Sequence, residues 1–166
     1  MSTKFFNNRL GNTLFDKLKG IASEMATFDR FLAVVGFFRS SGYFKLRKEL
    51  GDISEIKILV GINIDDIFRK HNKTLLMLAN EDKAKEIYHN GFKEDIVNAQ
   101  YAPEVEEGIL QMCEDLVSGR LQMRIHATKN LHAKFYLCLP QNHSEHSDGW
   151  VIMGSSNISD SGLGIK

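Results

Sequence analysis

Residues 31–62 read FLAVVGFFRSSGYFKLRKELGDISEIKILVGI, and this stretch decides the fold. The apolar runs at 31–38 and 55–62 are short and rich in β-branched and aromatic residues, which predicts two strands buried on both faces. Between them, YFKLRKEL reads as a helix with Ser40 or Ser41 as its N-cap. Because strand, helix and strand follow one another, we expect a parallel pair of strands joined by a crossover helix.

Helical spacing of apolar residues recurs on both sides of this unit. Residues 10–25 carry leucine, isoleucine and methionine at intervals of three and four, which predicts an amphipathic helix. Residues 63–101 are mostly helical in composition. Residues 103–119 have the strongest helical pattern, since Pro103 suits a first turn and Gly119 suits the C-terminal end.

A further strand is predicted at residues 121–126, where apolar and polar side chains alternate and Arg124 and His126 share the polar face. No internal repeat or low-complexity linker divides the chain. We therefore expect one α/β domain over residues 1–166, with a mixed β-sheet sandwiched by helices. Because the chain ends directly after a glycine-rich turn, we also expect it to be the N-terminal part of a longer protein.

The composition is ordinary for a globular protein, with 43% apolar and 25% charged residues. Two cysteines, Cys113 and Cys138, lie within apolar patterns, which argues against a disulfide scaffold or a cysteine zinc site and favours a reducing compartment. No apolar run approaches the roughly 20 residues of a membrane span, and the N-terminus lacks a signal-peptide core. These features predict a soluble, cytoplasmic protein.

The formal net charge of zero argues against a strong sequence-independent grip on nucleic acid. The charges are unevenly placed, however. Residues 81–115 hold ten acids and three lysines, whereas residues 116–144 hold four arginines and lysines and no acid. This distribution predicts either a local electropositive site or, more simply, acids along one solvated helix face beside a chance basic run.

A cluster of polar residues follows within residues 131–157, which read LHAKFYLCLPQNHSEHSDGWVIMGSSN. His132 and Lys134 are two positions apart on a predicted strand, so their side chains point to the same face. A hairpin to a second strand, Trp150 to Met153, would bring them close to the following Gly-Ser-Ser-Asn. An imidazole, an ammonium, a carboxamide and two hydroxyls then suit a phosphate. The simpler alternative is a hairpin with a half-exposed histidine and an ordinary turn.

This segment resembles the H-x-K … G-S-x-N signature of the phospholipase D-like superfamily. More narrowly, the chain resembles the single-copy nuclease-like domains at the front of bacterial helicases and in some restriction endonucleases. LAVVGFFRSSGYFKLRKEL, IKILVGI and YAPEVEEGILQMCEDLVSGRLQMRIHATKNLHAKFY match that subgroup in the same order. The resemblance implies a phospholipase D-like fold and a metal-independent phosphodiesterase without a cofactor.

The resemblance also implies roles for single residues. His132 matches the nucleophile that forms a phosphohistidine intermediate. Lys134 and Asn157 match the residues that hold the non-bridging phosphate oxygens. The turn of Gly154, Ser155 and Ser156 is expected to line the phosphate pocket, Ser155 through its hydroxyl and Ser156, at the variable position, in a structural role.

Three departures from the family pattern stand out. The aspartate that follows the lysine by five residues is replaced by Leu139, the loop at 141–149 is long, and the glutamate that orients the histidine is expected beyond Lys166. Since the mechanism needs two histidines, we expect a homodimer that shares one composite site.

The expected function is therefore cleavage of nucleic acid, most plausibly DNA, within a helicase or restriction system. Two alternatives remain at this stage: a catalytically silent module that binds DNA phosphates, and a hydrolase of phospholipids or other small phosphodiesters.

Three further features have simple explanations as well as functional ones. His126 and Arg124 would line a groove beside the site, or lie on the surface. Ser40 stands at a strand-to-helix junction that suits an anion, although helix capping alone explains the serine. The histidines and acids of loop 141–149 read better as a polar turn than as a metal site.

Overall fold

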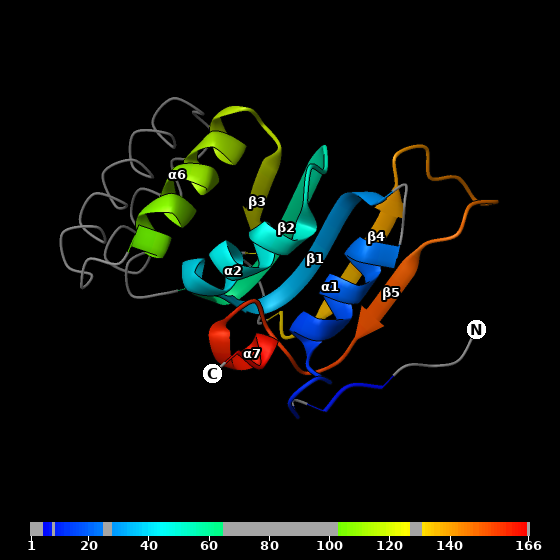
Figure 1. The fold of residues 1–166 in the computed structure, drawn as a ribbon, viewed down its shortest axis with the longest axis horizontal. Coiled ribbons are helices and arrows are strands. Elements are labelled where there is room, and N and C mark those ends of the chain that lie inside the picture. Colours follow the sequence, from blue (N-terminus) through cyan, green and yellow to red (C-terminus); the bar gives the residue numbers. More distant parts are fainter. Residues whose placement is uncertain (1–4, 8, 25–27, 65–102, 127–130, 166) are drawn as a thin grey trace.

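The computed structural model describes residues 5–7, 9–24, 28–64, 103–126 and 131–165. Among these residues the chain forms a five-stranded mixed sheet with strand order β3-β2-β1-β4-β5 (Figure 1). The strands are β1 (Phe28–Phe38), β2 (Glu55–Ile64), β3 (Leu121–Ile125), β4 (Phe135–Pro140) and β5 (Trp150–Met153). The helices are α1 (Leu14–Glu24), α2 (Ser40–Leu50), α6 (Pro103–Val117) and α7 (Asp160–Leu163). The predicted α/β class and mixed sheet are confirmed.

The strand–helix–strand unit forms as predicted, because β1 and β2 pair in parallel and α2 connects them. The predicted helix cap is wrong. The N-cap is Arg39, in extended conformation and without a side-chain cap, so Ser40 and Ser41 lie in the first turn. The reason is a contact from far along the chain: the backbone N–H of Arg39 donates to the Ile158 carbonyl at 2.8 Å and holds Arg39 outside the helix.

The first helix begins later than predicted, at Leu14. A capping box sets this start, since the Thr13 N–H donates to Asp16 Oδ2 at 2.8 Å and the Asp16 N–H donates to Thr13 Oγ1 at 3.1 Å. The pKa of Asp16 is lowered because its carboxylate accepts hydrogen bonds from the Thr13 N–H and the Thr13 hydroxyl. Leu10 therefore lies outside the helix and is fully exposed.

The described helices form one layer, because α1 contacts α2, α2 contacts α6, and α7 contacts both α1 and α2. Burial in β1 alternates accordingly: Phe31, Ala33 and Val35 are buried, whereas Leu32 and Val34 are half-buried. The prediction that this strand is buried on both faces is therefore wrong for the described part of the chain, where the helices cover one face.

The predicted helix at residues 63–101 lies outside the described residues, apart from Asn63 and Ile64, which extend β2. The predicted helix at 103–119 and strand at 121–126 correspond to α6 and β3. None of the helices in the described ranges is long and apolar enough to cross a membrane.

One edge of the sheet collects several chain ends. The parallel strands β1, β2 and β3 end there, the antiparallel β4 begins there, and β5 ends there. The chain then crosses back to the end of β1, where Ile158 forms a parallel bridge with Phe38. Residues from the beginning, middle and end of the sequence thus meet at the carboxyl edge of β1.

Candidate functional site

Three side chains predicted for the site meet above one glycine of β1, Gly36. An ideal Cβ on this glycine would lie 3.3 Å from His132 Cδ2, 3.3 Å from Lys134 Nζ and 3.5 Å from Asn157 Oδ1. The first two side chains precede β4 and the third follows β5. The hairpin and the return of the chain to β1 therefore bring the predicted groups together.

The histidine and the lysine lie just before β4 rather than on it, because β4 begins at Phe135. Lys134 is 6% exposed, and its Nζ donates to the His132 carbonyl at 2.8 Å. Burial lowers the pKa of Lys134. His132 is exposed, and its ring meets the ring of Phe37 edge-on, with centroids 6.5 Å apart. A buried cation therefore lies beside an accessible imidazole.

The amide of Asn157 is held in one orientation. Its Oδ1 accepts a hydrogen bond of 3.0 Å from the backbone N–H of Phe37. Because an N–H needs an oxygen acceptor here, the Nδ2 hydrogens must point away from β1. Within the described residues no hydrogen bond uses them, so they remain two donors for a ligand that carries negative charge.

The turn before Asn157 is tied to the strands at several points. The buried Tyr136 hydroxyl donates to the Ser156 carbonyl at 2.6 Å, and the Gly154 N–H donates to the Lys134 carbonyl at 3.3 Å. Burial raises the pKa of Tyr136, so its hydroxyl keeps the donating proton. Ser156 is itself buried. These bonds fix the turn against the segment that carries the lysine.

Gly154 and Ser155 face a different space. They line a groove of about 770 Å³ bounded by Phe5 and Phe6, by α1 and by β5, which none of the three side chains over Gly36 lines. Ser155 is exposed at this groove. Among the predicted phosphate-binding residues, the structure thus places the turn beside the site but aims part of it toward α1.

The remaining predicted residues border the same edge of the sheet. The backbone N–H of His126 donates to the Val60 carbonyl within β2, and Arg124 is exposed on β3, opposite Leu59. Since β2 lies between β3 and β1, both residues are one strand removed from the centre of the site. Ser40 begins α2 directly after β1 and is half-buried.

Sequence reasoning missed Gly36, the Phe37 N–H and Tyr136. One signal for Gly36 was available, because a lone glycine in a run of aromatic and β-branched residues often marks a bulge or a close approach. The register of β1 against β2 does shift between Val35 and Phe37. The other two groups act through contacts that no local pattern encodes.

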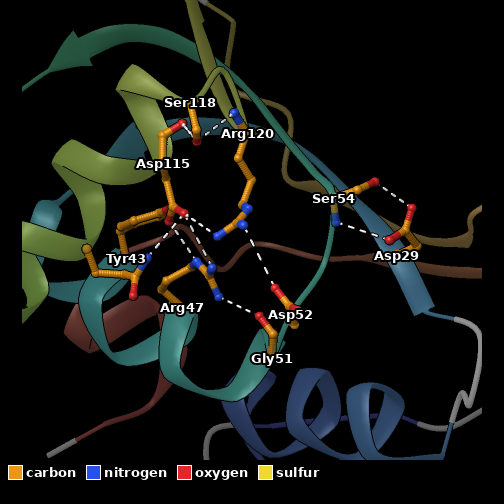
Figure 2. Close-up of polar contacts among 10 residues, drawn as sticks. Asp29, Tyr43, Arg47, Gly51, Asp52, Ser54, Asp115, Ser118 and Arg120 are labelled. Atoms are coloured by element: carbon orange, nitrogen blue, oxygen red, sulfur yellow. Dashed lines mark hydrogen bonds and ion pairs between the residues drawn. The ribbon is translucent and has the colours of Figure 1, made fainter.

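A second polar cluster, also not predicted, lies between α2, α6 and β3 (Figure 2). Asp115 is fully buried and accepts hydrogen bonds from Tyr43 Oη at 2.8 Å, Arg47 Nε at 2.7 Å and Arg120 Nη1 at 3.0 Å. Gln111 and the Nη2 of Arg47 complete its shell at 3.3 Å. The expectation that the acids near residue 115 lie on a solvated face is therefore wrong for Asp115.

The charges of this cluster stabilise one another. Burial alone would raise the pKa of Asp115, but the hydrogen bonds from Arg47 and Tyr43 outweigh it and the pKa is lowered. The pKa of Arg47 is raised, since its bond to Asp115 outweighs the cost of burial. We call Tyr43, Arg47, Asp115 and Arg120 the Asp115 cluster.

In loop 141–149, His143 Nδ1 and Ser147 Oγ form a hydrogen bond of 2.9 Å across a turn. Over the part of the chain that the structure describes, no three His, Cys, Asp or Glu side chains gather as a metal site would require.

In comparisons with known proteins, no family model and no curated protein matches the chain.

Proposed function

We propose that this chain carries a metal-independent phosphodiesterase site for nucleic acid, most plausibly DNA, in a helicase or restriction system. The observation that supports it is the convergence of His132, Lys134 and Asn157 on one point above Gly36. The three supply a nucleophile, a cation and an amide donor, the set that phosphoryl transfer without a metal requires.

Each group has a distinct task in this proposal. The exposed imidazole of His132 reaches the phosphorus of a bound phosphodiester. Lys134 lies nearly buried beside it, so its charge acts on the phosphate oxygens through a medium of low polarity, where attraction is stronger than in water. The Nδ2 hydrogens of Asn157 donate to a second oxygen, because the Phe37 N–H holds the amide in that orientation.

The reaction has two steps. A ring nitrogen of His132 attacks phosphorus, the bond from phosphorus to the leaving nucleoside oxygen breaks, and a second histidine gives its proton to that oxygen. Water then attacks the phosphohistidine, passes its proton to the second histidine and releases His132. After the two steps together, both histidines are back in their starting states.

The second histidine is proposed to be His132 of another copy of the chain, with the two sites facing each other across a two-fold axis. A composite site makes the specific activity depend on protein concentration. At concentrations where light scattering shows monomers, activity per chain is expected to fall. Constant activity per chain down to a purely monomeric sample contradicts the dimer but leaves the chemistry in place.

The central experiment is cleavage of single- and double-stranded DNA in the presence of EDTA. His132→Ala is expected to abolish cleavage, since no other group in the proposal attacks phosphorus. His146→Ala is the control, because His146 is exposed in loop 141–149, at the opposite end of the β4–β5 hairpin from the site. Full activity of His132→Ala refutes the proposed function.

A second candidate is a binding module that holds a nucleic-acid phosphate without cleaving it. One observation favours it: within the described residues, no hydrogen bond orients the His132 ring, whose contact is the edge of Phe37. This alternative predicts DNA binding that weakens steeply with salt and no turnover. Two results would support this alternative over cleavage. The wild-type protein would bind DNA without forming products, and binding would persist in His132→Ala but be lost in Lys134→Ala.

A further inference from the structure

Two glycines of the sheet and one of helix α1 differ in what a side chain at their position would contact. At Gly36, each of the three nearest atoms belongs to a side chain of the proposed site. At Gly61, one strand away, a Cβ would overlap the backbone carbonyl of Leu131. At Gly20, in α1, a Cβ would have nothing within 4 Å. Gly36 thus lies against the side chains of the proposed site, whereas Gly61 lies against the backbone of Leu131, the residue before His132.

Backbone conformation does not explain the glycine at position 36. The glycines with positive φ in the described residues are Gly11, Gly51, Gly119 and Gly164. Gly36 is absent from that set, so alanine fits its backbone dihedrals. A requirement for glycine at this position must therefore come from the space above it.

We propose that Gly36 is a positioning residue of the site, and that its missing side chain provides the space in which the three site groups meet a phosphate. The inference rests on the proposed function. With hydrogen alone on its Cα, Gly36 lets the imidazole and the ammonium lie against the strand. Its neighbour Phe37 can then donate its N–H to the Asn157 amide, so strand and side chains form one surface.

An alanine here would act on chemistry more than on folding. Contacts of 3.3 Å are relieved when His132 Cδ2 and Lys134 Nζ move by a few tenths of an ångström, which the ends of flexible side chains do at small cost. Attack on phosphorus is more demanding, because a misplacement of about 1 Å can cost about a hundredfold in rate. A smaller shift is therefore expected to slow cleavage by about tenfold.

The test compares Gly36→Ala with Gly20→Ala. Gly36→Ala is expected to lower kcat about tenfold and to raise KM, while the melting temperature changes little. Gly20→Ala is expected to keep the wild-type kcat and to melt at or above the wild-type temperature, because alanine favours a helix more than glycine does. A Gly36→Ala protein with wild-type kcat, or one unfolded at the assay temperature, overturns the inference while the proposed function stands.

Binding of inorganic phosphate separates this inference from the proposed function. In the wild type, phosphate is expected to shift the NMR ring resonances of His132, and Gly36→Ala is expected to weaken that binding about tenfold. If the wild type binds phosphate but does not cleave DNA, the function fails and weakened binding in Gly36→Ala still supports a positioning role. If phosphate does not bind the wild type, or binds both proteins equally, the inference fails.

Discussion

The side chains over Gly36 and the Asp115 cluster are both polar groups placed against the core. They differ in how many of their hydrogen-bonding atoms find a partner within the protein. In the Asp115 cluster the carboxylate accepts from a tyrosine, two arginines and a glutamine, so both of its oxygens are occupied. Over Gly36, the Lys134 ammonium has one acceptor and the Asn157 amide hydrogens have none within the described residues.

This difference distinguishes polar groups that stabilise the fold from polar groups that can bind a ligand. A buried charge whose partners all come from the protein joins elements of the fold, here α2, α6 and β3. A nearly buried charge with donors to spare is expensive to keep unless a ligand completes it. Substitutions should therefore lower stability in the Asp115 cluster and lower activity at the side chains over Gly36.

The largest effect is expected from Asp115→Ala. It leaves the buried Arg47 without its partner, and breaking such a pair typically costs about 3–5 kcal/mol of unfolding free energy. Urea denaturation measures it. The neighbouring Glu114→Ala, at an exposed position, is expected to stay within about 0.5 kcal/mol of the wild type. Equal effects of the two substitutions would contradict a structural role for the cluster.

Lys134→Met is expected to do the reverse. Loss of one charged donor at the phosphate typically slows turnover by about 10²–10³. Stability should be kept or raised, because an apolar chain of similar length replaces a desolvated charge. Lys48→Met is the control, since Lys48 forms an exposed pair with Glu107. Cleavage rates and urea unfolding of both variants measure the two effects. A Lys134→Met protein that unfolds easily and still cleaves DNA would show that Lys134 stabilises the fold and is not needed for cleavage.

A smaller effect is expected from acid. Asp115 has a lower pKa in the folded protein than in the unfolded chain. Its contribution is therefore complete above the unfolded pKa, about 3.9, and is lost as pH falls through the folded pKa. Urea unfolding at a series of acidic pH values measures the slope. In Asp115→Asn this part of the slope should vanish, and an unchanged slope would assign it to other carboxyl groups.

The smallest effect is expected from Tyr136→Phe, which leaves the buried Ser156 carbonyl without its donor. Such a loss costs about 1–3 kcal/mol of stability. Because the same bond fixes the turn before Asn157, cleavage should also slow modestly. Thermal unfolding and kcat measure the two effects. A loss of stability with kcat unchanged would place Tyr136 with the structural polar groups rather than with the site.

How much could be predicted from the sequence differs between the two regions. The strand–helix–strand unit and the hairpin were predicted from local periodicity, and His132, Lys134 and Asn157 from their place in the hairpin. Asp115 was not, because nothing in the helical pattern of α6 distinguishes a buried aspartate from its exposed neighbours. Its partners Tyr43 and Arg47 lie on another helix, 72 and 68 positions away.

The sequence by itself determined the order of strands and helices, since these depend on the spacing of apolar residues within each segment. The tertiary structure alone decided that the Phe37 N–H meets an amide 120 positions away, that Arg39 occupies the N-cap position of α2 and that the described helices cover one face of the sheet. The physical reason is that each of these contacts joins segments brought together by the sheet, and local spacing carries no record of which distant group will fill a given space.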